Sequence, residues 1–185
     1  MCFENLISTS INTVRRYSDF NKFKTILYKF DFDKTRFIDF KKRNQQLIEN
    51  NKNEYGYSKI KIFENQIFDI YAIFWFQNSE SPYHDHSDNG CYYKVLDGIL
   101  EETILNNNKE VIKQKNINNN IVGYMDNSIG YHKIKNIREY LPDSEDPLGN
   151  VKNKYEHASI SIHAYSPPNY EANIIDTTPT KSDIY

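Results

Sequence analysis

From residue 57 onward the chain alternates short runs rich in Ile, Val, Tyr and Phe with clusters of Asn, Asp, Gly and Ser. The apolar runs are typical of β-strands, and the polar clusters between them are typical of tight turns. The pattern predicts strands at residues 57–63, 68–76, 82–86, 91–96, 99–105, 109–114, 120–125, 131–137 and 157–166. Many short strands at this spacing favour a barrel or a jelly roll, so we expect a mainly β protein.

The chain ahead of these strands has a different texture. Residues 18–50 space Phe, Ile and Leu at intervals of three and four, with one polar break, so we expect two short amphipathic helices. A length of 185 residues suits one domain, in which this helical flank precedes a barrel at about 55–168. Residues 138–154 are polar and contain two prolines, and we expect them to form an exposed inserted loop. Residues 169–185 are expected to form a tail.

Composition and charge restrict the partners that the chain can have. The formal net charge of -2 provides no basic field for nucleic acid or an anionic membrane, and we expect neither as a partner. The most apolar run, residues 67–76, is too short for a membrane span and contains Asp69. The start of the chain shows no secretory signal. With only Cys2 and Cys91 a disulfide framework is excluded, and we expect a monomer in the reducing cytoplasm.

Two histidines provide the first hint of chemistry. His84 and His86 stand two residues apart in the predicted strand 82–86. Alternate strand residues project from the same face, so both imidazoles can point at one metal ion. An H-x-H pair also arises by chance, and on the pair alone two ordinary surface histidines are the open alternative.

The residues around this pair make a longer motif. The stretch HDHSDNGCYYKVLDG, which begins at His84, resembles the first metal-binding motif of the cupin superfamily. That motif consists of H-x-H, a short gap, a glutamate, six residues and a glycine, and Cys91 stands at the glutamate position here. The later stretch HKIKN resembles the second cupin motif and contributes His132 and Asn136. The resemblance therefore implies His84, His86 and His132 as three metal ligands.

Three stretches narrow the resemblance to one family within the cupins. HDHSDNGCYYKVLDG, DNSIGYHKIKN and SISIHAYSPP occur in this order and together resemble the type I cysteine dioxygenases. The resemblance implies a cupin jelly-roll β-barrel with a short helical N-terminal flank and one Fe(II) ion per chain. It also implies oxidation of L-cysteine by O2 to cysteine sulfinic acid. Three imidazoles alone bind several divalent metals, so the choice of iron comes from the family and from cellular supply.

The last of these stretches carries the remaining implied site residues. Its alternation places Ser161, His163 and Tyr165 on one strand face. By resemblance Tyr165 offers its phenol to the substrate, His163 orients Tyr165, and Ser161 supports His163. The resemblance also implies a thioether bond between Cys91 and Tyr165, and a buried, unmodified thiol is the open alternative. In relatives the peptide before Pro167 is cis, and we expect the same here.

One segment departs from the family pattern. The family has a Y-x-R segment whose tyrosine and arginine contact the substrate, and the matching residues here are Tyr57 and Lys59. Lysine keeps the positive charge but lacks the planar fork that binds a carboxylate through two hydrogen bonds. Lys61, two residues further on the same strand face, is the alternative counterpart, and both lysines could instead be ordinary solvated residues.

This departure leaves two other functions open. One is oxidation of another small thiol, such as 3-mercaptopropionate. The other is a metal-binding cupin without catalytic activity that acts as a sensor or interaction module. The fifth histidine, His157, receives no role. The preferred prediction is a cysteine dioxygenase whose partners are a small thiol and O2.

Overall fold

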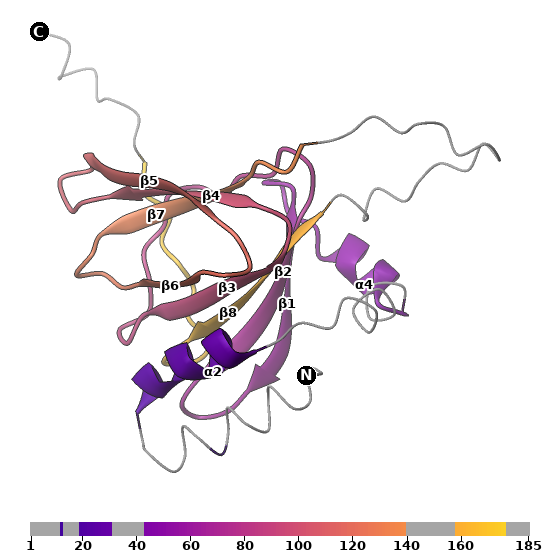
Figure 1. Cartoon of the computed structure of the whole chain (residues 1–185), viewed down its shortest axis with the longest axis horizontal. Coiled ribbons are helices and arrows are strands. Elements are labelled where there is room, and N and C mark those ends of the chain that lie inside the picture. Colours follow the sequence, from indigo (N-terminus) through magenta and orange to yellow (C-terminus); the bar gives the residue numbers. More distant parts are fainter. Residues whose placement is uncertain (1–11, 13–18, 31–42, 140–157, 177–185) are drawn as a thin grey trace, which may run out of the picture.

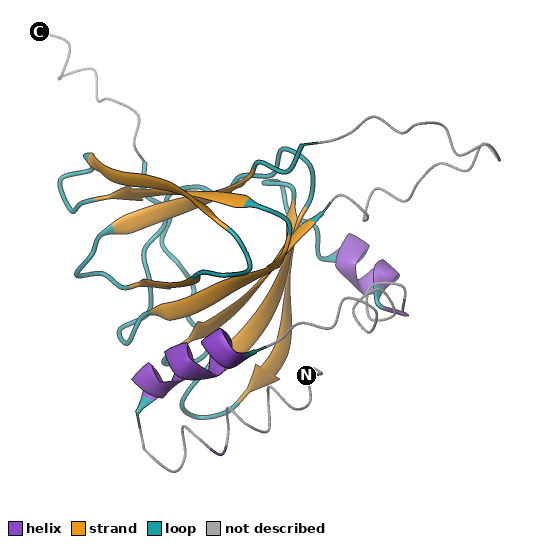
Figure 2. Cartoon of the chain, viewed as in Figure 1, coloured by secondary structure: helices purple, strands orange, loops and turns teal. Residues whose placement is uncertain are grey.

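The structure of the chain is a computed structural model that describes residue 12 and residues 19–30, 43–139 and 158–176. Within these residues the chain is mainly β (Figure 2). The strands are β1 (Tyr57–Glu64), β2 (Asp69–Trp75), β3 (Cys91–Asp97), β4 (Leu100–Leu105), β5 (Val111–Ile117), β6 (Val122–Met125), β7 (Tyr131–Asn136) and β8 (Ser159–Tyr165). They form a five-stranded sheet in the order β1-β2-β8-β3-β6 and a three-stranded sheet in the order β5-β4-β7. The prediction of a mainly β jelly roll is confirmed, and the described strands form two sheets that are not closed into a barrel.

Antiparallel pairings between strands that are distant in the sequence build each of the two sheets. In the larger sheet β8 lies between β2 and β3, and in the smaller sheet β7 pairs with β4. The smaller sheet lies over one face of the larger one (Figure 1). Buried side chains from both sheets, including Trp75, Val95, Ile104 and Ile134, form one apolar cluster. This cluster is the interior toward which the site residues of both sheets point.

Short helices cover the outer face of the larger sheet (Figure 1). The helices are η1 (Phe20–Lys22), α2 (Phe23–Lys29) and α4 (Gln45–Asn50). Phe23, Ile26 and Leu27 of α2 are buried, because spacing of three and four residues places them on one helix face. They pack in a cluster with the outward side chains of β8, so both faces of that strand are buried. Both described α-helices lie within the predicted flank at 18–50.

One predicted strand was wrong. Residues 82–86 contain two isolated bridges, from His84 to His132 and from His84 to Ile174, and no regular strand. Pro82 has no N–H to donate, so the ladder is interrupted beside it. The segment still runs next to β7, because the His84 N–H donates to the His132 carbonyl at 3.0 Å and the reverse bond is 3.2 Å. The other eight strands lie within three residues of their predicted bounds.

Part of the predicted domain division lies outside the described residues. Of the loop predicted at 138–154 the structure describes the first two residues, and Cys2 and His157 also lie outside the described ranges. Of the tail predicted at 169–185, residues 169–176 are described. They pack back on the body of the molecule instead of leaving it, because their backbone and side chains find hydrogen-bond partners there.

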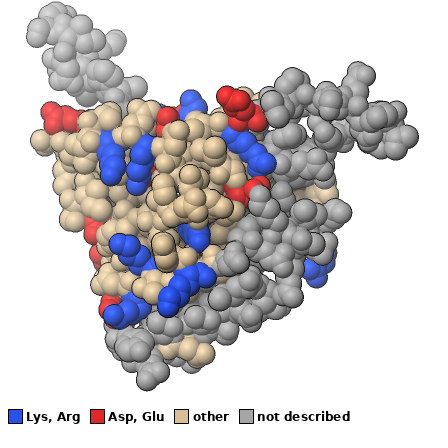
Figure 3. All heavy atoms as spheres, viewed as in Figure 1, with Lys and Arg blue, Asp and Glu red and all other residues tan. Residues whose placement is uncertain are grey.

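Charged side chains are dispersed over the face seen in Figure 3. Lys and Arg side chains alternate with uncharged surface there, and Asp and Glu lie mostly toward its margins. None of the helices within the described ranges has the length and apolar character that crossing a membrane requires.

Candidate metal centre and adjoining cavity

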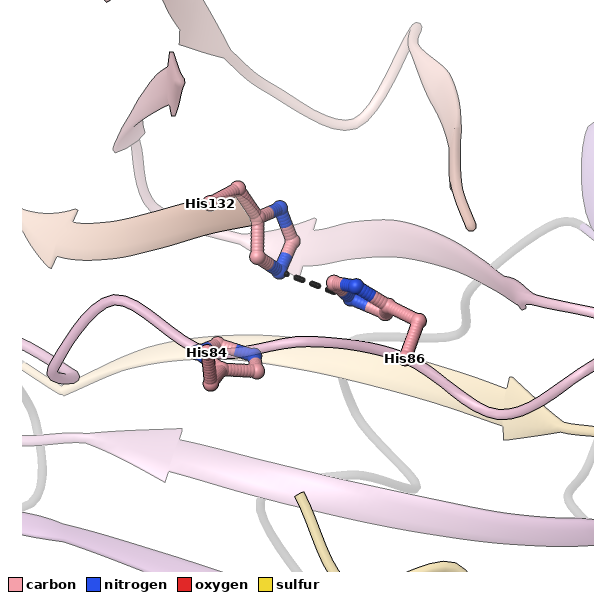
Figure 4. Close-up of side chains that lie close together, drawn as sticks. All are labelled: His84, His86 and His132. Carbon is pink, nitrogen blue, oxygen red and sulfur yellow. Dashed lines mark hydrogen bonds between the residues drawn. The ribbon is translucent and has the colours of Figure 1, made fainter. Parts of the chain in front are cut away.

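Three histidines from two parts of the chain meet at one point. His84 and His86 come from the connection between β2 and β3, and His132 comes from β7. One ring nitrogen of each lies within 4.8 Å of the other two. The Nε2 atoms of His86 and His132 are 3.1 Å apart (Figure 4). The three predicted metal ligands therefore converge, as a group that could hold a metal ion.

Hydrogen bonds fix how the rings are turned. The Nδ1 atom of His84 lies 2.9 Å from the Pro82 carbonyl, and the Nδ1 atom of His132 lies 2.7 Å from Glu102 Oε1. Both oxygens only accept hydrogen bonds, so each Nδ1 carries the proton and each Nε2 keeps its lone pair. The Nδ1 of His86 is buried and has no hydrogen-bond partner among the described residues, while its Nε2 faces His132. The lone pairs thus point toward a shared position.

This donor set fits a divalent first-row metal ion. Burial lowers the pKa of His84 to about 3 and that of His86 well below its usual value. Both rings are therefore neutral near pH 7, which is the form that binds metals. Two nitrogens that each bind one ion at about 2.1 Å lie about 3 Å apart, in agreement with the 3.1 Å between His86 and His132. Three imidazoles without a carboxylate leave coordination positions for further ligands.

Glu102 on β4 is a site residue that the sequence reasoning missed. Its buried carboxylate accepts hydrogen bonds from His132 Nδ1 and from the Tyr93 hydroxyl, and it lies 2.8 Å from the Lys115 ammonium. Burial alone would raise the pKa of Glu102, but these partners lower it to about 2. The signal was present in the sequence, because Glu102 occupies the apolar face of the alternating stretch LEETIL.

Cys91 and Tyr165 are direct neighbours across β3 and β8. Both side chains are buried. Burial raises the pKa of both groups above their usual values. Cys91 is not a member of the possible metal-ligand group, which contains the three histidines. The structure thus brings together the two side chains that the predicted thioether bond would join.

A short chain of hydrogen bonds leads from Trp75 to His163. The Trp75 N–H only donates, so Ser161 Oγ accepts it at 2.8 Å, and the Ser161 hydroxyl is free to donate to His163 Nε2 at 2.8 Å. Burial lowers the pKa of His163, so the neutral ring carries its proton on Nδ1, which lies 3.8 Å from Cys91 Sγ. Among the described contacts, the rings of His163 and Tyr165 are nearly parallel with their centroids 6.1 Å apart, and no hydrogen bond joins the two side chains.

A cavity of about 160 Å³ adjoins the histidines. Aromatic, basic and apolar side chains line it: Tyr55, Tyr57, Lys59, Ile73, Trp75, Ser81, Pro82, His84, His132, Ile134, His163, Tyr165, Tyr170, Ala172 and Ile174. The Lys59 ammonium lies 4.3 Å from the ring centroids of Tyr71 and Tyr165, at cation–π distance. Burial lowers the pKa of Lys59 below its usual value. The cavity therefore combines imidazoles, four phenols and an ammonium.

The structure distinguishes Lys59 from Lys61, the two lysines that the sequence offered as alternative counterparts of the family arginine. Lys59 lines the cavity together with Tyr57. The Lys61 ammonium instead lies 2.5 Å from both Glu64 Oε2 and Asn169 Oδ1 and is not among the residues that line the cavity. Of the two lysines, Lys59 is thus the one that lines the cavity beside the histidines.

Another wall of the cavity comes from the chain after β8. The chain leaves β8 through the Ser166–Pro167 peptide, which is cis, as predicted. Tyr170, Ala172 and Ile174 then line the cavity. The sequence reasoning had assigned these residues to a tail without a role.

Comparison with known proteins adds to this picture. A family model described as "Cysteine dioxygenase type I" matches residues 49–178. Cysteine dioxygenase type 1 of Rattus norvegicus is 28% identical over 122 residues, which make up 62% of this chain and 53% of that protein. The Homo sapiens protein of the same name is 25% identical over 151 residues, 78% of this chain and 64% of that protein. The chain therefore spans about half to two thirds of the length of these curated relatives. Among solved structures, the cupin domain of Schizosaccharomyces pombe Cnp3 matches with a TM-score of 0.41 and 16% identity, over 60% of this chain and 64% of that chain.

Proposed function

The chain belongs to the cysteine dioxygenase type I family, and on that premise we propose that it is an Fe(II)-dependent thiol dioxygenase. The proposed reaction converts L-cysteine and O2 to cysteine sulfinic acid. One observation carries the proposal: His84, His132 and the ammonium of Lys59 line the same small cavity. Groups suited to a metal ion and to a substrate carboxylate therefore face one space.

The three histidines, His84, His86 and His132, would hold one metal ion per chain. Imidazole donors alone do not select iron, so Fe(II) is proposed from the family and from cellular supply. When bound, Fe(II) supplies the one-electron chemistry through which O2 can react with a thiol. Glu102 holds the His132 ring with its Nε2 lone pair toward the ion.

The side chains around the cavity would bind and orient the thiol. Lys59 provides a positive charge in a partly desolvated position, where pairing with a carboxylate is stronger than in water. Tyr57 and Tyr165 line the cavity, and their hydroxyls would donate hydrogen bonds to the substrate. The cavity is smaller than the roughly 300–1,000 Å³ of pockets for drug-sized ligands, which supports a substrate with few atoms.

We also propose that Cys91 and Tyr165 become joined by a thioether bond. The reaction joins Cys91 Sγ to a ring carbon next to the phenol oxygen of Tyr165. It removes two protons and two electrons, which O2 accepts. The register between β3 and β8 supports this step because it places the two residues opposite each other. Ser161 would keep His163 in the tautomer whose Nδ1 faces the sulfur.

The test of the proposed function uses the full chain loaded with Fe(II) without oxygen. The protein is then exposed to O2 with L-cysteine, 3-mercaptopropionate and cysteamine in parallel, and products are identified by mass spectrometry. A gain of two oxygen atoms on cysteine supports the proposal. A gain on 3-mercaptopropionate alone would move the substrate to a thiol without an amine, a choice that lysine at the arginine position favours. If iron-replete protein yields no product, the result would contradict the proposed thiol dioxygenase activity. It would favour a metal-binding cupin that acts as a sensor or interaction module.

The cellular setting stays a prediction. We propose a cytoplasmic monomer, and the buried free thiol of Cys91 is consistent with a reducing compartment. Size-exclusion chromatography with light scattering measures the oligomeric state.

A further inference from the structure

Residues 169–176, here called the wall segment, run beside the residues that carry two of the proposed metal ligands. Ile174 forms an isolated bridge with His84. The Ile175 N–H donates to the Tyr83 carbonyl at 2.8 Å, and the Asp85 N–H donates to the Asn173 carbonyl at 3.2 Å. The wall segment is thus paired with the backbone on which His84 and His86 stand.

The side chain of Asp85 holds this pairing in place. Asp85 Oδ1 accepts hydrogen bonds from the Tyr170 hydroxyl at 2.5 Å and from the Asn173 N–H at 2.6 Å. Asp85 Oδ2 accepts a third from the Asn173 side-chain amide at 2.7 Å. Hydrogen bonds to an ionised carboxylate are stronger than those between neutral groups. One carboxylate therefore anchors two residues of the wall segment.

The start of the wall segment is anchored separately. Asn169 donates its backbone N–H to Asp69 Oδ2 at 2.8 Å and its side-chain amide to Glu64 Oε1 at 2.7 Å. Between the Asn169 anchor and Asn173, Tyr170 and Ala172 line the cavity, and Ile174 lines it one residue further. The position of these three side chains is therefore set by contacts outside the cavity.

We propose that Asp85 is a positioning residue that fixes the wall segment, and that Ala172 and Ile174 thereby exclude thiols with bulky substituents from the histidines. The inference rests on the proposed function and deepens it, because it names the substrate class as small thiols unbranched beside the sulfur. Penicillamine, which is cysteine with two methyl groups on the carbon that bears sulfur, is the matched bulky thiol. Replacing Ile174 by alanine removes apolar bulk from the cavity wall and should admit it.

The first measurement follows the wall segment and needs neither metal nor turnover. Amide hydrogen exchange by mass spectrometry compares the full chain with Asp85→Asn and with Asp88→Asn. Asp88 is exposed in the same loop, so its variant removes an equal charge and serves as the control. We expect at least tenfold faster exchange at residues 170–176 in Asp85→Asn, with unchanged exchange in β8. Unchanged exchange of the wall segment would overturn the role of Asp85.

The second measurement follows selectivity in the Fe(II)-loaded enzyme. We expect Ile174→Ala to raise kcat/KM for penicillamine relative to L-cysteine by roughly tenfold or more, the size of effect that one or two methyl groups have in an apolar pocket. Asp85→Asn should raise KM for cysteine more than it lowers kcat, whereas Asp88→Asn should change neither. An unchanged ratio in Ile174→Ala would overturn the size limit.

A measurement of thiol binding distinguishes a failure of the proposed function from a failure of the inference about the wall segment. Trp75 is the single tryptophan of the chain and lines the cavity, so its fluorescence reports thiol binding without turnover. If the wild-type chain oxidises no thiol, the proposed function fails. Tighter binding of penicillamine relative to cysteine in Ile174→Ala then supports the wall inference, and an unchanged ratio of binding constants overturns it.

Discussion

At position 59 the chain carries an ammonium where the resemblance to the family implies a guanidinium, and Lys59 lines the cavity together with the proposed metal ligands His84 and His132. Lys59→Met keeps the length of the side chain and removes its charge. We expect kcat/KM for L-cysteine to fall roughly 10- to 100-fold, since a hydrogen bond to a charged group contributes about 1.5–3 kcal/mol. Cysteamine has no carboxylate, so its kcat/KM should change little. Steady-state kinetics with both thiols measures the difference.

The control for this experiment is Lys113→Met, because Lys113 is exposed on β5 and does not line the cavity. Equal losses for cysteine and cysteamine in Lys59→Met would contradict carboxylate binding by Lys59.

Glu102 provides a second prediction at the scale of one residue. Glu102→Gln keeps the shape of the side chain but removes the negative charge that faces His132 and Lys115. Partners that orient a ligand histidine typically contribute 10- to 100-fold in metal affinity, so we expect a loss of that order in the affinity for Fe(II). Competition with a chelator measures the dissociation constant. Glu101→Gln on the opposite strand face is the control, and equal affinities in the two variants would refute the role of Glu102.

Cys91 permits a test that needs only a mass spectrum. If the thioether bond forms, protein that has turned over cysteine is lighter than its sequence by the mass of two hydrogen atoms. Peptide mapping should join the peptides that contain Cys91 and Tyr165. Cys91→Ser should keep its full sequence mass under the same conditions. An unchanged mass of the wild-type chain after turnover would favour the alternative of a buried, unmodified thiol.

Residues whose chemistry depends on local spacing could be predicted from the sequence. His84 and His86 belong to one short motif, and a resemblance added His132. The position of Glu102 on the apolar face of LEETIL was a signal of a buried carboxylate, but its partner His132 is identified only by the pairing of β4 with β7. The same limit left Lys59 and Lys61 unresolved, since both occupy one face of β1 and differ only in what β2 and the chain after β8 place next to them.

At the scale of elements, the pattern of apolar runs bounded by turn residues predicted the strands well, because several strands are buried at nearly every position and polar turns separate them. It failed at 82–86, where the residue types are those of a strand but Pro82 interrupts the hydrogen-bond ladder. It also could not predict that residues 169–176 return to the cavity, because their anchors lie far away in the sequence, at Asp69 and Asp85.

The end of β7 is tied to two other strands by Asn136, the last residue of the second motif. Its side-chain amide donates to the carbonyls of Trp75 and Phe76 at 2.9 and 3.0 Å, and its oxygen accepts from the Ser159 hydroxyl at 2.7 Å. Asn136→Ala would remove all three of these buried hydrogen bonds, so we expect the free energy of unfolding to fall by about 2–4 kcal/mol. Urea denaturation measures it. Asn108→Ala, in the exposed turn between β4 and β5, is the control, and a loss no larger than in that variant would contradict the structural role of Asn136.

At the scale of the whole molecule, the proposed metal centre connects parts that are distant in the sequence. His132 belongs to the smaller sheet, whereas the cavity residues Lys59, His163 and Tyr165 belong to the larger one. His84 and His86 lie on the connection between β2 and β3 and are held against β7 by backbone hydrogen bonds. A bound ion would therefore restrain the connection against the smaller sheet, and it would do so only in the folded chain.

This coupling predicts that metal stabilises the fold. An ion that binds the folded chain and not the unfolded chain adds about 4 kcal/mol at a thousandfold excess over its dissociation constant, which corresponds to an increase in Tm of roughly 10 °C for a chain of this size. Differential scanning calorimetry without oxygen, with and without Fe(II), measures the shift. Replacing His84, His86 or His132 by alanine should abolish both iron retention and the shift, whereas His157→Ala, outside the metal-ligand motifs, should keep both. A shift that persists in His132→Ala would place the stabilising ion elsewhere and would contradict the ligand set on which the proposed chemistry depends.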